Sequence, residues 1–172
     1  MHTSGATHIK VLQKATDNFG VFYPVQTFTK EREIDFSNIP ILIEASNEYT
    51  YETLFSVAKS ICKNSYAVDT ANRKKIHLAA VFVNNFTNHL YVIADDILSA
   101  NEYGFNLLEP LIEETAHIIK DKFPVNLQTG PAIRGDKKTM KAHIKLLADN
   151  KDYQNIYKLL SKSIIKSSKN KK

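Results

Sequence analysis

The sequence predicts an α/β protein, with a partial parallel sheet over residues 1–69 and an all-α helical domain over residues 70–172. Three observations lead to this prediction. Before residue 70, short apolar runs of β-type residues alternate with helical patterns. After it, the spacing of apolar residues changes from a period of two to the helical period. The order strand, helix, strand is also typical of right-handed crossovers between parallel strands.

Three apolar runs predict the strands of the sheet. They cover residues 20–24, 39–44 and 65–68, and a short helix near residues 7–15 precedes the first of them. Three strands are too few for a free-standing doubly wound sheet. The sheet is therefore expected to be either a small complete one or part of a larger protein.

A helix is predicted between the second and third strands. Asn47 or Thr50 is its candidate cap, since short polar side chains accept hydrogen bonds from the free N–H groups of a first turn. The apolar residues that share one face of this helix are Leu54, Val57, Ala58 and Ile61.

The second part of the chain begins with one long predicted helix over residues 71–99. Apolar residues occur on nearly all of its faces, which is typical of a helix buried between other elements or between subunits. Three short helices and a partial sheet do not suffice to enclose this helix fully. The sequence therefore predicts a homodimer or another partner chain on it.

Three further helices are predicted after this long one. Gly104 interrupts the chain, and Asn106 is the expected cap of the next helix, with Glu109 at the capping-box position and Pro110 in the first turn. A loop over residues 126–135 follows. The last two helices carry two apolar sets, Met140, Ile144 and Leu147 in one and Tyr153, Ile156, Tyr157, Leu160 and Ile164 in the other.

Composition and charge exclude several classes of protein. Of the 172 residues, 43% are apolar and 24% are charged, which is typical of a soluble globular protein. No apolar run reaches membrane-spanning length, and the first residues do not form a secretory signal. The single cysteine, Cys62, cannot form an internal disulfide or a cysteine-based zinc site, and the histidines lack metal-ligand spacing. We therefore expect a cytoplasmic protein without a membrane partner and without a metal.

The net charge of +5 comes from the end of the chain. A basic tail over residues 160–172 contains five lysines and no acid, and the rest of the chain has 18 basic and 18 acidic residues. Such a tail is usually a solubilising terminus, so nucleic acid is not an expected partner.

The glycines exclude two nucleotide-binding motifs. No two of the five are separated by two positions, so the chain has no G-x-G-x-x-G fingerprint, and it has no P-loop. Both motifs hold phosphates at the N-terminus of a helix. We therefore expect that this chain alone does not bind a dinucleotide.

Several segments resemble a known family in order and spacing. They are H-T-S-G (2–5), Y-P-V-Q-T-F (23–28), I-P-I-L-I-E (39–44), H-L-A-A-V-F-V-N-N-F-T-N-H (77–89) and Q-T-G-P-A-I-R-G-D (128–136). These segments resemble a bacterial family of two-domain oxidoreductases. Its members join a Rossmann-like NAD(P)-binding domain to a helical domain of unknown function, number 2520, which is similar to the C-terminal domain of 6-phosphogluconate dehydrogenase-like enzymes.

The resemblance implies a division of this chain and a cofactor. Residues 1–69 are similar to the C-terminal half of the Rossmann-like domain, so the sheet is a partial Rossmann-like parallel sheet, and residues 70–172 are similar to the helical domain. The N-terminal nucleotide-binding half of the family is missing from these 172 residues. The resemblance implies NADP or NAD as the cofactor of the intact protein.

Polar residues on the long predicted helix form the first candidate site. His77, Asn84 and Asn88 are separated by seven and four residues, so a regular helix places them on one face. The functional interpretation is a substrate-binding stripe with His77 as the catalytic proton donor, which the resemblance favours because related reductases place amides of this helix against the substrate. The alternative is hydrogen bonding between helices, or a stripe facing solvent.

The segment 128–136 forms the second candidate site. Gln128 and Arg134 are the expected substrate-binding residues, and Arg134 can clamp a carboxylate or phosphate with two hydrogen bonds. We expect Asn84, Asn88 and Arg134 to converge on one cleft. The alternative is a structural connection in which Asp136 caps the next helix and Arg134 pairs with an acid of this chain.

The third candidate site lies at the predicted carboxyl ends of strands. Open α/β sheets bind ligands there, and Ser4, Gly5 and Gln26 are the expected cofactor-binding residues, with groups that can face a nicotinamide ring. The alternative is that they are only turn residues.

Three functions compete at this point. The first is the C-terminal portion of an NAD(P)-dependent oxidoreductase, which supplies substrate contacts and a dimer surface for the reduction of a small oxo- or hydroxy-acid. The second is a non-catalytic helical dimerisation module, left after loss of the nucleotide-binding half. The third is a protein that binds nucleic acid or an acidic partner through its lysine tail.

Overall fold

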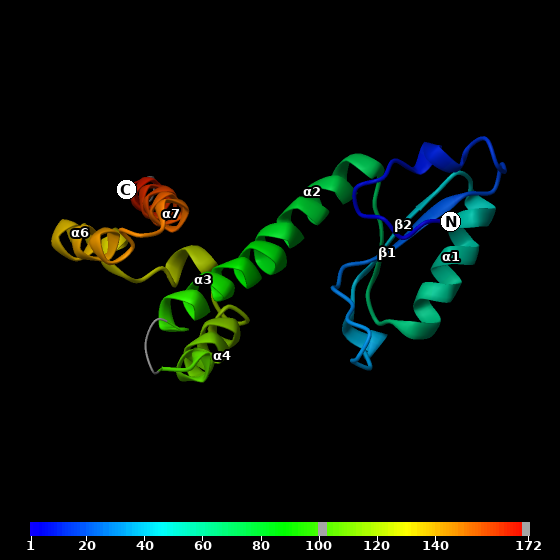
Figure 1. Cartoon of the computed structure of the whole chain (residues 1–172). Helices are drawn as coiled ribbons and strands as arrows, with labels where there is room; N and C mark the ends of the chain where they lie inside the picture. Colours follow the sequence, from blue (N-terminus) through cyan, green and yellow to red (C-terminus); the bar gives the residue numbers. More distant parts are fainter. Residues whose placement is uncertain (100–102, 170–172) are drawn as a thin grey trace. The chain divides into compact units, whose positions relative to one another are not determined.

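The computed structural model describes residues 1–99 and 103–169, which divide into two compact units (Figure 1). The first unit is Met1–Tyr91 and the second is Val92–Lys172. All strands of the described residues lie in the first unit, and the second is helical. The predicted fold class, a small sheet followed by a helical part, is confirmed.

The sheet has three strands in the order β1-β2-β3. They are β1 (Gly20–Pro24), β2 (Ile41–Ala45) and β3 (Ser65–Ala67). Strands β2 and β3 are parallel, as predicted, and are joined by helix α1 (Glu48–Ile61). Strands β1 and β2 are antiparallel, so the sheet is mixed, whereas a mostly parallel sheet was expected.

The segments between the strands explain this difference. A parallel return needs a crossover, which is usually a helix that covers the sheet, and α1 supplies one between β2 and β3. The connection over residues 25–40 contains only the three-residue 3₁₀-helix η2 (Phe36–Asn38). Without a crossover helix, the chain turns back and β2 runs against β1. On the other edge, His2 forms a parallel bridge with Val21.

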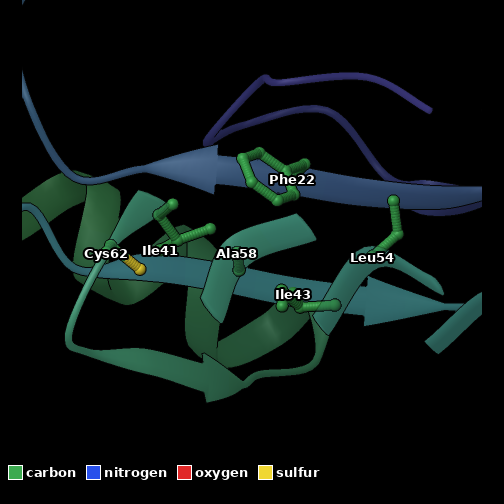
Figure 2. Packing of buried hydrophobic residues seen from close by; sticks show 6 residues of the cluster. All are labelled: Phe22, Ile41, Ile43, Leu54, Ala58 and Cys62. Carbon is green, nitrogen blue, oxygen red and sulfur yellow. The ribbon is translucent and has the colours of Figure 1, made fainter. Parts of the chain in front are cut away.

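The core of the first unit lies on both faces of the sheet. On one face, residues of β1 and β2 pack against α1, and Figure 2 shows this cluster: Phe22, Ile41, Ile43, Leu54, Ala58 and Cys62. On the other face, a second cluster contains Ile9, Val21, Tyr23 and Leu42, with Ile76 packed against it. Because β2 is buried on both faces, its sequence is a continuous apolar run rather than an alternating one.

Local hydrogen bonds fix the ends of the helices in this unit. Asn47, one of the two predicted caps, accepts a hydrogen bond from the Thr50 N–H at 2.9 Å and starts α1. Asp69 accepts from the Asn72 N–H at 2.7 Å and starts α2 (Thr70–Ala80). Near the N-terminus, the predicted helix is a single 3₁₀ turn, η1 (Ile9–Leu12).

The long predicted helix is present but is not regular. It consists of α2, the π-helical segment η3 (Val81–Phe86) and α3 (Thr87–Ser99), which follow one another without a break. A π-helical turn contains more residues than an α-helical turn, so it changes which positions share a face. Within the first unit, large apolar side chains of this helix remain exposed: Leu78, Phe82, Val83, Phe86 and Leu90.

The second unit contains the remaining helices. They are η4 (Phe105–Leu108), α4 (Glu109–Ile118), η5 (Pro124–Asn126), α5 (Pro131–Arg134), α6 (Lys137–Leu146) and α7 (Lys151–Lys169). Asn106 does not cap α4, contrary to the prediction, because a 3₁₀ turn that starts after Gly104 incorporates it and α4 begins directly after that turn. Pro110 lies in the first turn of α4, as predicted.

Two predictions about the end of the chain can be compared with this unit. Asp136 caps α6 by accepting from the Thr139 N–H at 3.0 Å. Residues 160–169 of the predicted basic tail continue α7, and residues 170–172 lie outside the described residues. No helix of the described chain is both long enough and apolar enough to cross a membrane.

Candidate functional site

A fully buried arginine organises the N-terminal segment of the first unit. The Arg73 guanidinium on α2 donates hydrogen bonds to the backbone carbonyls of Ser4 at 2.8 Å, Gly5 at 3.2 Å and Thr7 at 2.9 Å. Its charge is balanced by Glu44 at the end of β2, at 2.8 Å. A buried charge needs such partners, because desolvation is costly. Arg73 thereby holds the segment that follows His2 against the start of α2.

This arrangement brings Gly5 against the imidazole of His77. A Cβ atom added at Gly5 would lie 2.5 Å from His77 Nδ1 and 2.6 Å from Cγ. Such distances are far below van der Waals contact, so any side chain at this position would displace the ring or the loop. The residue type at position 5 is therefore set by the close approach of the loop to His77.

Tyr23 holds the same imidazole from the sheet. Its hydroxyl lies 3.0 Å from His77 Nδ1, and the two rings meet edge to face with centroids 5.8 Å apart. Tyr23 is buried in the second core cluster, so its position is fixed by the packing of β1. The pKa of the Tyr23 phenol is raised by burial, although the nearby Arg73 charge lowers it in part. The phenol is thus protonated at neutral pH.

A cavity of about 610 Å³ lies beside this histidine, and we call it the strand-end cleft. It is bounded by the residues that follow β1 and by residues 76–85 of the long helix. Its apolar lining comes from Val25 and the helix. Its polar lining carries no charged residue and consists of Tyr23, Gln26, Thr27, His77, Asn84 and Asn85. Such a cleft can bind a small, partly apolar molecule through hydrogen bonds.

Several residues predicted from the sequence meet at this cleft. His77, Asn84 and Gln26 line it, although they were assigned to different candidate sites. Gly5 lies behind the His77 ring. Ser4 forms hydrogen bonds within the protein. Its backbone carbonyl accepts a hydrogen bond from Arg73, and its hydroxyl accepts one from the Thr7 N–H at 3.0 Å.

Asn88 is exposed on α3 and does not line the cleft, whereas Asn85 does. The spacing argument for His77, Asn84 and Asn88 assumed a regular α-helix. Because η3 lies between His77 and Asn88, the faces before and after it are not related by the α-helical period. Single π turns of this kind are frequent at functional sites.

Gln128 and Arg134 belong to the second unit. Gln128 lines a cavity of about 310 Å³ together with Ile133 and residues of α7. Arg134 is the exposed last residue of α5, whose flanking glycines Gly130 and Gly135 have φ angles of 100° and 70°. Glycine adopts such angles without strain. The convergence of Arg134 with Asn84 and Asn88 stays a prediction.

Sequence reasoning missed two residues of this site: Arg73 and Glu44. Arg73 precedes two exposed lysines and resembles them in the sequence. A signal was present, however, because Glu44 ends a continuous apolar strand and needs a buried cation. Tyr23 was part of the segment of the third candidate site, but its contact with His77 was not predicted. In residues 1–99 and 103–169, no three His, Cys, Asp or Glu side chains are grouped so that they could hold a metal ion.

The chain is similar to several known proteins. Residues 39–164 match the family described as "Domain of unknown function (DUF2520)". The structure is similar to that of the "putative NADP oxidoreductase BF3122" from Bacteroides fragilis, with 42% identity and a TM-score of 0.93, over 96% of this chain and 64% of that one.

The fold is also similar to that of protein TM1727 from Thermotoga maritima, with 19% identity and a TM-score of 0.80, over 99% of this chain and 68% of that one. This chain therefore spans less than two thirds of the length of the Bacteroides protein. No curated protein matches the chain.

Proposed function

The chain belongs to the DUF2520 family, and we propose that it is the C-terminal portion of an NAD(P)-dependent oxidoreductase. In this proposal it supplies the substrate contacts and the dimer surface for the reduction of a small oxo- or hydroxy-acid. The strand-end cleft carries the proposal, because it combines an imidazole, three amides and an apolar wall in one cavity. The similarity to the Bacteroides protein supports it.

In this site, His77 is the proposed proton donor to the substrate oxygen. Asn84 and Gln26 are the proposed hydrogen-bonding partners of the substrate and of the nicotinamide end of the cofactor. Asn88, Gln128 and Arg134 remain proposed substrate-binding residues, with Arg134 as the clamp for the carboxylate. A cleft without charges of its own needs such a clamp from another element if the substrate is an acid.

The residues present do not fit the pyrophosphate of a dinucleotide. The helix N-termini that follow β2 and β3 are already capped by the side chains of Asn47 and Asp69. The cavity at these strand ends includes the acids Glu44, Glu48 and Asp69, which repel phosphate. We propose that NADP or NAD is held in the whole protein by residues outside these 172, and that this chain alone binds neither tightly.

Titration calorimetry tests this part of the proposal directly. NADPH added to the 172-residue chain is expected to give no saturable binding in the micromolar range. Micromolar binding would overturn it.

The catalytic part of the proposal is tested in the longer Bacteroides protein. We expect oxidation of NADPH in the presence of one of a panel of small oxo-acids. Replacing the residue aligned with His77 by Phe is expected to lower kcat by about 10²–10⁴-fold, the usual contribution of a positioned proton donor.

Replacing the residue aligned with Arg134 by Lys is expected to raise KM about tenfold, since a lost bidentate contact is worth on the order of 1.5–3 kcal/mol. A change at the position aligned with the exposed Lys138 is the matched control and should alter neither constant. An unchanged kcat after the first replacement would overturn the role of His77.

A second candidate function is a non-catalytic helical dimerisation module. The exposed apolar side chains of α2 and η3 favour it, since a partner chain would cover them. It would be preferred if the longer protein forms a dimer but oxidises NADPH with no oxo-acid. In either case we propose a homodimer and, because Cys62 is a buried free thiol, a cytoplasmic location.

A further inference from the structure

We propose that Tyr23 is a positioning residue that holds the His77 imidazole in its Nε2–H tautomer. Nε2–H then serves the strand-end cleft as a neutral hydrogen-bond donor for a carbonyl or hydroxyl oxygen. The inference rests on the proposed function, in which the His77 side chain faces the substrate oxygen. The inference assigns a role to Tyr23, which the proposed function did not include, and it defines which ring nitrogen of His77 carries the proton.

The geometry leaves only one nitrogen of the ring for a ligand. Nδ1 is engaged by the Tyr23 hydroxyl at 3.0 Å, and Gly5 packs against the same side of the ring. In the described part of the chain, no protein group forms a hydrogen bond with Nε2 of His77. Since His77 lines the cleft, Nε2 is the atom that a bound molecule can reach.

The direction of the Tyr23–His77 hydrogen bond follows from the needs of the phenol. If Nδ1 carried the proton and donated it, the phenolic proton would need a second acceptor. Among the described residues, the Tyr23 hydroxyl has no hydrogen-bond partner other than His77. An unpaired buried donor is unfavourable by on the order of 1–3 kcal/mol. With the phenol donating to Nδ1, its proton is paired and the imidazole proton lies on Nε2.

The charges closest to this site are paired with each other. The Arg73 guanidinium is the fixed positive charge of this region, and Glu44 neutralises it. The polar lining of the cleft itself carries no charged side chain. The other polar groups of the cleft, from Gln26, Thr27 and Asn84, can complete the hydrogen bonds of an uncharged oxygen.

The chain contains a matched control for this pair. In the second unit, Tyr157 Oη lies 2.9 Å from His143 Nδ1, and these rings also meet edge to face, with centroids 5.6 Å apart. The pair therefore has the same local chemistry, but the cavity that Tyr157 lines has no amide side chain in its lining. A Tyr157→Phe variant removes an equivalent hydroxyl without touching His77.

Nitrogen NMR on the full chain with ¹⁵N-labelled histidine tests the proposal. At pH 8, wild-type His77 is expected to show an unprotonated Nδ1 and a protonated Nε2, together with a slowly exchanging phenolic proton. In Tyr23→Phe, this phenolic signal is expected to be lost, and the two ring nitrogens should shift toward the average of both tautomers. Tyr157→Phe should leave the His77 signals unchanged and shift those of His143.

Two results would overturn the proposal. One is a protonated Nδ1 of His77 in the wild-type chain, which requires no variant to fold. The other is an unchanged set of His77 nitrogen shifts in a folded Tyr23→Phe chain. Both readouts are independent of activity, so a fixed Nε2–H tautomer without NADPH-dependent turnover in the longer protein would overturn the proposed function and leave this inference intact.

Discussion

At the scale of single residues, a small number of buried polar groups decides the geometry of the candidate site. Arg73 connects the N-terminal segment, the end of β2 and the start of α2 through hydrogen bonds to backbone carbonyls and to Glu44. Gly5 and Tyr23 then both contact the Nδ1 side of the His77 ring. None of these contacts is apparent from residue type alone, because each depends on segments that are far apart in the sequence.

The buried ion pair gives the first stability prediction. In Arg73→Met, Glu44 keeps its charge without a cation, and three backbone carbonyls lose their donor. Removing one partner of a buried pair typically lowers the free energy of unfolding by about 3–5 kcal/mol, and we expect a loss of this size by urea denaturation. Lys74→Met, at the exposed neighbouring position, should change it by less than about 0.5 kcal/mol. A loss below about 1 kcal/mol for Arg73→Met would show that the pair does not anchor the segment.

His2 gives a prediction about pH. Its pKa is lowered from the ordinary value of 6.5, first by burial and then by the Arg73 charge. Because the unfolded chain binds this proton more readily, the stabilising effect of neutral His2 is fully present above pH 6.5 and is lost as the pH falls toward the lowered folded value.

We therefore expect the urea midpoint of the wild-type chain to fall between pH 7 and pH 5.5, and to fall less in His2→Asn. The exposed His8 offers the control, since His8→Asn should preserve the slope of the wild-type chain. Equal slopes for wild type and His2→Asn would contradict this assignment.

At the scale of elements, local caps and apolar spacing made most helices and strands predictable from the sequence, and the π-helical segment was not predictable. The strands, α1, α6 and α7 lie close to their predicted positions, because apolar periodicity and capping residues act locally. The irregular segment η3 was not predicted, since nothing in its residue types distinguishes it from an α-helix. Asn85, within this segment, lines the cleft, and Asn88, which follows it, does not.

The cap of α1 gives a prediction at this scale. The Asn47 side chain accepts from the Thr50 N–H and also donates to Asn18 Oδ1 at 2.8 Å, so it links α1 to the segment before β1. Asn47→Ala should lower the free energy of unfolding by about 1 kcal/mol or more, as for other lost caps. Asn47→Asp keeps the acceptor and removes the donor, so chemical denaturation of both variants separates the two contributions. If Asn47→Ala unfolds like the wild type, the cap is not a source of stability.

At the scale of the whole molecule, the exposed apolar side chains of the long helix are the main unexplained feature of the isolated chain. Phe82 and Phe86 form an edge-to-face pair with centroids 4.9 Å apart, and they are 61% and 50% exposed. Exposed apolar patches of this kind are typical of association surfaces. The homodimer that we propose would bury them.

Sedimentation gives the test of this proposal. At tens of micromolar, we expect a species of twice the 19.5 kDa of one chain. Phe86→Glu places a charge in the proposed interface and should weaken dimerisation by at least tenfold, since burying an unpaired charge is unfavourable. Thr53→Glu adds the same charge on α1, which packs on the opposite face of the sheet from Ile76 of α2, and should have no effect. A monomeric wild-type chain would contradict the proposal.

The sequence by itself determined the class of fold, the main helices and strands, and the family. These properties follow from local periodicity, caps and motifs, and residues 39–164 match the family as the motifs implied. Only the tertiary structure decided that β1 runs antiparallel to β2, that Tyr23 and Gly5 contact His77, and that Arg73 holds the Gly5 segment. The physical reason is that strand direction and buried hydrogen bonds depend on which distant segments share the core. The residue types and spacings within one segment do not show which distant segment it will pack against.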